Sequence, residues 1–405
     1  MHRCKICYSL NQEFYKLGSA PSVIRQLFAY GYEKAKEVGA ENVFDYSIGN
    51  PSIPAPAKVN ESIKAIVDEV DSIKVHGYSM AAGFDETRAA IAEDLSQRFD
   101  INVKSGEIFI TCGAAPALIS VIKALTVSQD TEIMIVAPFF PEYKPFINSN
   151  GAKAVVIPAD TQAFQIDLRK VENAINENTQ AIIINSPNNP SGVVYTVETL
   201  TGLAEILREK GKKYGHPIYI IADEPYRELV YGDTKVPFIP CIYNNTIVCY
   251  SYSKSLSLPG ERIGYVYVPE AAEDGKALFA AVAGAARIGG HVCPPTLIQM
   301  AIERCAKERP DLAAYDENRL LLYNSLTEMG YECAKPDGAF YLFVKAPNGD
   351  AVAFSETAKL EHNLLVVPGD GFGCPGYFRL SYCVSNDMIK RSLGSFKALI
   401  EKFSK

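Results

Sequence analysis

Short apolar runs alternate with longer amphipathic stretches through the middle of the chain. The runs are rich in isoleucine and valine, and most are continuous rather than interrupted by a polar residue at every second position. This pattern is typical of strands that are buried on both faces, as in a parallel sheet. We expect such strands at 107–113, 132–138, 154–159, 181–187, 217–225, 246–253 and 262–269.

Segments with helical periodicity separate these runs. In 196–213, leucines recur at helical spacing, Thr196 is a suitable N-cap, and lysines gather near the end. Similar apolar faces occur in 85–99 and 115–127. Alternation of strands and helices over this length predicts an α/β doubly wound sheet, which binds ligands at the carboxyl ends of its strands.

The pattern changes from residue 296 onward. A long helical pattern spans 296–329, and a second one closes the chain at 386–402. Between them lie three runs that we interpret as strands. They are 338–345, 364–369 and 377–383. This order of elements predicts an α+β segment that forms a second domain.

Composition narrows the class of protein. The chain has 405 residues, of which 48% are hydrophobic and 21% charged, with a net charge of −7. These values predict a large folded core and exclude disorder or a coiled coil as the main state. No apolar run reaches the ~18–20 residues that span a bilayer, and the start has no signal-peptide core. We therefore expect a cytoplasmic protein that does not insert into a membrane. We also expect no binding to nucleic acid, because the net charge is negative.

The ten cysteines are scattered, and several lie inside apolar runs. This distribution predicts reduced thiols packed as small hydrophobic side chains rather than a disulfide framework. Cys4 and Cys7 form a CxxC pair, but no second pair follows at zinc-ligand spacing. The five histidines form no HxxxH or HExxH cluster. We expect no metal site, and the role of the CxxC pair is left open.

Lys254 is the most informative residue for chemistry. It follows the apolar run 246–253, and Ser251, Ser253 and Arg262 lie near it in the sequence. A lysine amine is a useful nucleophile where it forms a Schiff base with an aldehyde cofactor. The hydroxyls and the guanidinium are groups that bind phosphate. A lysine is most often a solvated surface residue. The position of Lys254 at the end of a predicted strand is what favours a role in binding a cofactor.

Asp223 ends another apolar run, 217–225. A carboxylate in this position is costly unless a cation or a hydrogen bond compensates it. The protonated nitrogen of a pyridine ring would be such a cation, and the pair would make the ring an electron sink. Tyr226 could donate a hydrogen bond to a phenolate oxygen on the same ring. The alternative is that Asp223 caps a following helix, and the residues alone do not decide between the two.

Three further segments carry weaker signals. Asn189 lies in NSPNNPSG, whose composition a turn alone explains. Gly113, Ala114 and Ala115 follow a predicted strand and open a helix, where small residues let backbone N–H groups bind a phosphate. Phe140 could stack on an aromatic ring or belong to the core.

Taken together, these segments resemble the class I/II aminotransferases, which are fold-type I enzymes dependent on pyridoxal 5′-phosphate (PLP). The resemblance rests on NPSG, DEPY, SYSK and GERIGY, in that order and at this spacing, and it extends from YSIGNP (46–51) to FRLSY (378–382). It implies a PLP-dependent transferase-like fold, with a mostly parallel central sheet sandwiched by helices and a smaller α+β domain.

The resemblance also implies how the chain divides. Gly49 and Arg379 come from opposite ends of the chain, yet both would contact one substrate. We therefore expect a large PLP-binding domain at 53–295 and a small domain formed by 1–52 together with 296–405.

The resemblance assigns a role to each candidate residue. Lys254 would bind PLP as a Schiff base and then move a proton between the substrate Cα and the cofactor. Asp223 would pair with the pyridinium nitrogen, and Tyr226 would contact the ring oxygen. The other implied cofactor contacts are Gly113, Ala114, Ala115, Phe140, Asn189, Ser251, Ser253, Arg262 and, from a second subunit of a homodimer, Tyr78. The implied substrate contacts are Gly49, Asn189 and Arg379, whose guanidinium would bind the α-carboxylate.

The expected reaction transfers an amino group from an L-amino acid to a 2-oxo acid by a ping-pong cycle. Aspartate is one candidate donor, since Arg287 could contact a distal carboxylate, although a surface role for Arg287 is at least as well supported. Tyr143 stands where some family members have a histidine beside the aspartate. Two alternatives stay open: a PLP-dependent carbon–sulfur β-lyase on the same fold, and a relative that binds PLP without catalysis.

Overall fold

The computed structural model describes residues 10–20 and 22–404, so the CxxC pair at Cys4 and Cys7 lies outside the described residues. Within the described part of the chain, no helix combines the length and the apolar composition that crossing a bilayer requires.

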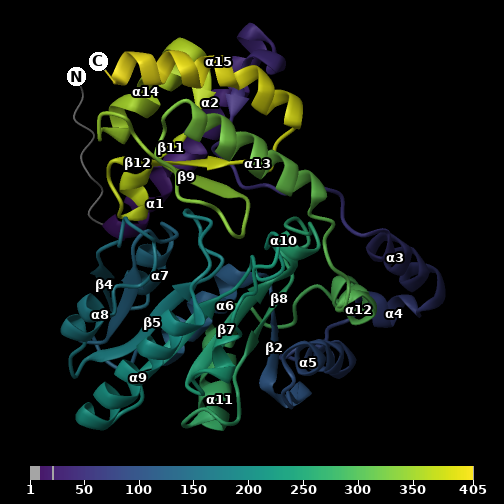
Figure 1. Cartoon of the computed structure of the whole chain (residues 1–405). Coiled ribbons are helices and arrows are strands. Elements are labelled where there is room, and N and C mark those ends of the chain that lie inside the picture. Colours follow the sequence, from purple (N-terminus) through teal and green to yellow (C-terminus); the bar gives the residue numbers. More distant parts are fainter. Residues whose placement is uncertain (1–9, 21, 405) are drawn as a thin grey trace.

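A seven-stranded sheet forms the centre of the molecule, in the order β2-β8-β7-β6-β5-β3-β4 (Figure 1). Its strands run parallel except β8, which is antiparallel to both of its neighbours. The seven predicted strands and the mostly parallel sheet are confirmed. The strands are β2 (Ile108–Thr111), β3 (Glu132–Val136), β4 (Lys153–Ile157), β5 (Thr179–Asn185), β6 (Tyr219–Asp223), β7 (Thr246–Ser251) and β8 (Gly264–Tyr267).

The central strands are apolar on both faces because each face meets helices. In β5, Ala181 and Ile183 pack into one core with helices α6 and α11, whereas Ile182 and Ile184 pack into another with α5, α9 and α12. Continuous apolar runs are therefore what this sheet requires. The helices on these faces are α3 (Ala57–Glu69), α5 (Asp85–Phe99), α6 (Ala114–Leu125), α7 (Tyr143–Ser149), α8 (Leu168–Ala174), α9 (Val197–Tyr214), α11 (Gly275–Ile288) and α12 (Thr296–Cys305).

The predicted helix at 296–329 is wrong in one respect, because the chain forms two helices there. Helix α12 ends at Cys305, and α13 (Ala313–Glu328) begins after an irregular segment that contains Pro310. Proline has no backbone N–H and disfavours helical geometry at the residue before it, so the periodic pattern cannot continue through it. Thr196, in contrast, caps α9 as predicted, since its hydroxyl accepts a hydrogen bond from the Thr199 N–H at 3.1 Å.

A smaller sheet and its helices lie beside the large sheet, in the upper part of Figure 1. Strands β11 (Val367–Pro368), β12 (Tyr377–Ser381) and β9 (Tyr341–Lys345) form an antiparallel sheet in that order. Helices α14 (Ala351–His362) and α15 (Asn386–Phe403) pack with it in one core. The run 364–369, predicted as one strand, divides between two sheets, because β10 (Leu364–Leu365) pairs with β1 (Phe44–Asp45) whereas β11 pairs with β12.

The β1–β10 pair joins the beginning of the chain to its end. Helix α2 (Val23–Val38) packs into a core that also contains Phe343 and Leu365. The division at residue 295 stays a prediction, and the shared core of α12 with the large sheet favours a boundary after α12. The remaining helices are α1 (Gln12–Ser19), α4 (Ser72–His76) and α10 (Tyr252–Ser255).

Candidate active site

A cavity of about 210 Å³ lies where β5, β6 and β7 end. These strands are neighbours and parallel, and Asn185, Asp223 and Cys249 stand opposite one another in register. Their carboxyl ends therefore present polar residues along one edge of the sheet. The predicted site residues that line this cavity are Ala114, Ala115, Phe140, Asn189, Asp223, Tyr226, Ser251, Ser253, Lys254 and Arg262.

Lys254 reaches the cavity from α10, which directly follows β7. Its Nζ donates a hydrogen bond to the carbonyl oxygen of Gly49 at 2.7 Å. Burial lowers the pKa of Lys254 to about 8; the Cys383 thiol opposes this shift, and the guanidinium groups of Arg379 and Arg262 add to it. A lysine with this pKa carries an appreciable fraction of free amine at neutral pH.

Asp223 is the last residue of β6 and is 5% exposed. Its Oδ2 accepts a hydrogen bond from Tyr143 Oη at 2.5 Å, whereas Oδ1 has no hydrogen-bond partner among the described residues. Burial raises the pKa of Asp223 to about 7, although the Tyr143 hydrogen bond opposes the shift. The alternative of a helix cap is wrong, because the residues after β6 form turns rather than a helix.

Arg379 extends from β12 and is 2% exposed. Its Nη1 donates to Asn189 Oδ1 at 2.9 Å, and its Nη2 donates to the carbonyl oxygen of Ser47 at 2.6 Å. Among the described residues no carboxylate pairs with this guanidinium, and its Nε has no hydrogen-bond partner. A buried cation without an anionic partner is costly, so this position favours the binding of an anion.

Small and cationic residues meet at the other end of the cavity. Helix α6 begins at Ala114, and Gly113 has a φ of +88°. A Cβ at Gly113 would lie 2.9 Å from Arg262 Nη2, the end of a flexible side chain, so it is the φ of +88° that favours glycine here. Ser251 and Ser253 contribute hydroxyl groups 2.7 Å apart. Free N–H groups at a helix start, together with hydroxyls and a guanidinium, are suited to a phosphate group.

Sequence reasoning missed two residues of the site. Tyr341 Oη lies 2.9 Å from Tyr226 Oη, and a Cβ at Gly49 would lie 2.1 Å from the Tyr341 hydroxyl, so Gly49 has to lack a side chain. No sequence signal separates Tyr341 from a core aromatic residue. Asn185 accepts a hydrogen bond from the Asn189 N–H at 2.7 Å and donates one to the Asp223 carbonyl at 2.8 Å. The place of Asn185 at the end of a predicted strand is a sequence signal that could have identified it as a site residue.

Five residues considered from the sequence as ligand contacts do not line this cavity: Gly49, Gly113 and Arg379, which border residues that do, and Tyr78 and Arg287. Tyr78 is 95% exposed, and its role at a neighbouring subunit stays a prediction. Arg287 lies exposed in the last turn of α11, so nothing within the described chain holds it at a substrate. Phe140 lines the cavity and packs edge-on against Tyr143, with the ring centroids 5.6 Å apart.

Comparisons with known proteins identify the family. The family model for aminotransferase class I and II matches residues 41–396. The chain belongs to the class I and II aminotransferases. It is 31% identical to a probable aspartate/prephenate aminotransferase of Aquifex aeolicus, over 91% of this chain and 94% of that protein. It is also 31% identical to an aspartate aminotransferase of Bacillus subtilis, over 92% of this chain and 95% of that protein.

A solved structure supports the same conclusion. The crystal structure of an aminotransferase from Eubacterium rectale is 54% identical in sequence and superposes with a TM-score of 0.96, over 98% of this chain and 99% of that one. The resemblance and the fold expected from the sequence are confirmed. The protein is an aminotransferase, and these relatives favour that activity over the carbon–sulfur β-lyase alternative.

Class I and II aminotransferases depend on PLP, and the residues in the cavity fit this cofactor. The unpartnered Oδ1 of Asp223 is a buried acceptor suited to a pyridinium N–H. The Gly113–Arg262 contact and the serine hydroxyls are suited to the phosphate. Lys254 supplies an amine whose pKa is lowered.

Proposed function

We propose that this aminotransferase binds PLP through Lys254 as a Schiff base and that Arg379 binds the α-carboxylate of the amino-acid donor. The observation that carries the proposal is the buried guanidinium of Arg379. It has no acidic partner among the described residues, and it contributes to the low pKa of Lys254. An α-amino acid brings an amine and a carboxylate to these two groups at once.

The cofactor contacts follow from where each side chain stands. Asp223 Oδ1 would accept a hydrogen bond from the pyridinium N–H, while Oδ2 accepts the one from Tyr143. Asn189, whose side chain accepts a hydrogen bond from Arg379, and Tyr226 would contact the ring oxygen. Phe140 would pack on the ring. The phosphate contacts are the backbone of Gly113, Ala114 and Ala115 and the side chains of Ser251, Ser253 and Arg262.

Bound PLP supplies an aldehyde carbon that takes up the amino group and a cationic ring that withdraws electrons from the substrate Cα. The protein supplies the proton transfer. Once the amino group of the substrate has displaced Lys254 from the cofactor, Nζ would be a free amine and would remove the proton from Cα, because a pKa of about 8 lets it accept that proton and release it again near neutral pH. The amino acid and the 2-oxo acid use the same site in turn, as a ping-pong cycle requires.

The aminotransferase acts as a homodimer in this proposal, with Tyr78 of each chain completing the partner's phosphate site. Its exposure of 95% supports this arrangement. The cytoplasmic location stays a prediction from the sequence. Both relatives compared above are named for aspartate, and prephenate, in one of the names, is a 2-oxo acid that would accept the amino group; aspartate is therefore the donor that these names suggest.

A half-reaction tests the role of Arg379. The PLP-loaded enzyme is titrated with an L-amino acid in the absence of 2-oxo acid, and conversion of bound PLP is followed by absorbance. Arg379→Ala removes charged hydrogen bonds of about 1.5–3 kcal/mol, so the half-saturating amino-acid concentration rises about 10- to 150-fold. Arg391→Ala, at an exposed arginine of α15, is the matched control and leaves the titration unchanged. Equal titrations of Arg379→Ala and wild type would contradict the proposal.

A further inference from the structure

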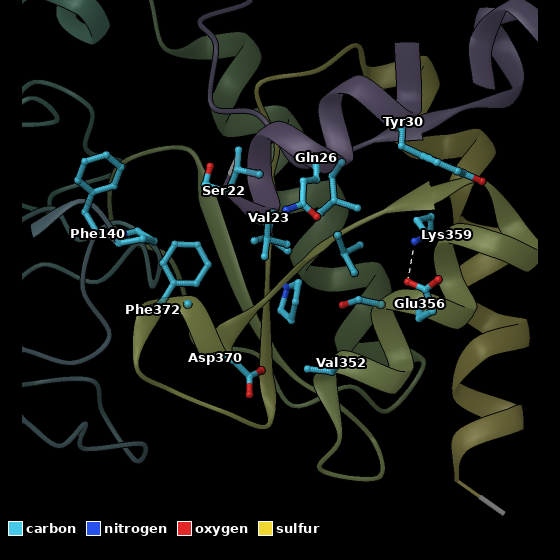
Figure 2. A pocket seen from close by; sticks show the side chains of 18 of the residues that line it. Ser22, Val23, Gln26, Tyr30, Phe140, Val352, Glu356, Lys359, Asp370 and Phe372 are labelled. Carbon is cyan, nitrogen blue, oxygen red and sulfur yellow. Dashed lines mark ion pairs between the residues drawn. The ribbon is translucent and has the colours of Figure 1, made fainter. Parts of the chain in front are cut away.

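A second and larger cavity, of about 450 Å³, lies beside the active site. It is enclosed by α2, α14 and the loop that begins α7, together with β11 and the short helix η4 (Gly369–Phe372) (Figure 2). Cavities that hold small ligands are typically about 300–1,000 Å³, so this volume is sufficient for a ligand group.

Two aromatic residues border both this cavity and the active site. Phe140 lines both cavities. Phe372 lines the larger one, and its ring centroid is 5.1 Å from the Arg379 guanidinium. In Figure 2, Phe140 and Phe372 lie at one end of the cavity, and Lys359 and Glu356 lie at the other. A substrate whose α-carboxylate is bound by Arg379 would therefore lie near the aromatic end of this cavity.

The middle of the cavity is apolar. Val23 and Leu27 face it from α2, and Val366 and Val367 face it from the segment around β11. Figure 2 shows Val23 projecting from α2 between the two ends. Burial of apolar groups against such walls is favourable by about 25 cal/mol per Å², and it rewards a long hydrocarbon side chain more than a short one.

The charged residues of the cavity disfavour a distal carboxylate. Among the described residues that line it, Lys359 is the only cation, and its Nζ is 2.6 Å from a carboxylate oxygen of Glu356. Glu142 and Asp370 add two further negative charges. A substrate carboxylate placed here would meet like charges and find no free cation.

We propose that this cavity receives the side chain of the amino-acid substrate and that the preferred substrates carry a large apolar side chain, of the leucine, methionine or phenylalanine class. The proposal rests on the proposed function, because it takes Arg379 as the anchor of the α-carboxylate. It identifies the donor as an apolar amino acid rather than aspartate.

The test measures kcat/KM of the PLP-loaded enzyme for a series of unbranched amino acids, from alanine through norvaline to norleucine, and for phenylalanine, aspartate and glutamate. Each buried methylene raises kcat/KM about fourfold, so norleucine exceeds alanine by about 50-fold. We expect aspartate and glutamate to fall below norleucine. A flat series, or a preference for aspartate or glutamate, overturns the proposal while leaving the aminotransferase activity in place.

A variant that fills the cavity tests whether the preference for a long apolar side chain arises there. Val23→Trp places a large ring in the cavity and lowers the ratio of kcat/KM for norleucine to kcat/KM for alanine at least tenfold. This ratio is insensitive to a loss of folded enzyme. Arg25→Trp, on α2 but not at the cavity, is the matched control and leaves the ratio unchanged. An unchanged ratio in Val23→Trp overturns the proposal. If no amino acid converts the bound PLP of the wild type, the proposed function falls, and this inference falls with it.

Discussion

Replacing Asp223 by asparagine should stabilise the PLP-free enzyme above neutral pH. Burial raises the pKa of this carboxyl to about 7, from an ordinary value of 3.8. In the unfolded chain the carboxyl loses its proton near its ordinary pKa, whereas in the folded chain it keeps the proton until about pH 7. The folded state therefore binds more protons between these limits, and its stability falls as the pH rises through them.

The size of the effect follows from the two pKa values. Their difference, at about 1.4 kcal/mol per pKa unit, corresponds to about 4 kcal/mol of lost stability above pH 7 and to about 1.5 kcal/mol at pH 5. Asparagine carries no charge, and its amide oxygen can accept the same hydrogen bond from Tyr143. The advantage of Asp223→Asn over wild type in free energy of unfolding should grow by about 2–3 kcal/mol between pH 5 and pH 8.

Urea denaturation of the PLP-free proteins at pH 5 and pH 8, at one protein concentration, measures this difference. Asp68→Asn, at an exposed carboxyl of α3, is the matched control, and its difference from wild type should not change with pH. A variant that is less stable than wild type by the same amount at both pH values would refute the reasoning. With PLP bound the order should reverse, because Asp223→Asn removes the anion that pairs with the cationic ring.

Other changes test the remaining parts of the site. The rate at which the PLP-free enzyme captures PLP should rise about tenfold per pH unit up to about pH 8 and then level off, because only the free amine of Lys254 reacts. After borohydride reduction, mass spectrometry should find PLP attached to the wild type and none attached to Lys254→Ala. Tyr143→Phe should raise the pKa of Asp223 by about 1–2, since a hydrogen bond to a charged group contributes about 1.5–3 kcal/mol, and urea denaturation across pH should show the shift. Arg262→Gln should weaken the binding of PLP at least tenfold but leave the binding of pyridoxal, which has no phosphate, unchanged in a fluorescence titration.

The large sheet was predictable because its central strands meet helices on both faces. Ile182 and Ile183 point into different cores, so the run that contains them is continuously apolar. The position of Lys254 and Asp223 was predictable for the same reason, since each follows such a run. The direction of β8 could not be predicted, because RIGYVYVP is equally apolar whichever way the strand runs. Its antiparallel direction places Arg262, which precedes it, at the edge where the parallel strands end.

Contacts between distant parts of the chain also could not be predicted from the local pattern. The Arg379–Ser47 hydrogen bond and the Tyr226–Tyr341 contact each join residues more than a hundred positions apart. Periodicity describes neighbours within one element and carries no information on such pairs. The family resemblance placed Arg379 at the substrate, yet it did not include Tyr341, whose hydroxyl occupies the space that a side chain at Gly49 would need.

The low polarity of the pocket shifts the pKa of its acid and the pKa of its base in opposite directions, and a cationic cofactor ring reverses the shift of the acid. Burial raises the pKa of Asp223 and lowers the pKa of Lys254, so the empty pocket tends to neutralise both groups. Arg379 cannot respond in this way, because a guanidinium stays charged. A cationic ring restores the charge on Asp223, and an anionic α-carboxylate pairs with Arg379. The unpartnered charges of Asp223 and Arg379 thus each correspond to an opposite charge that a ligand brings. Because the pocket is of low polarity, the attraction between these opposite charges is stronger there than in water, and it favours binding of the ligands.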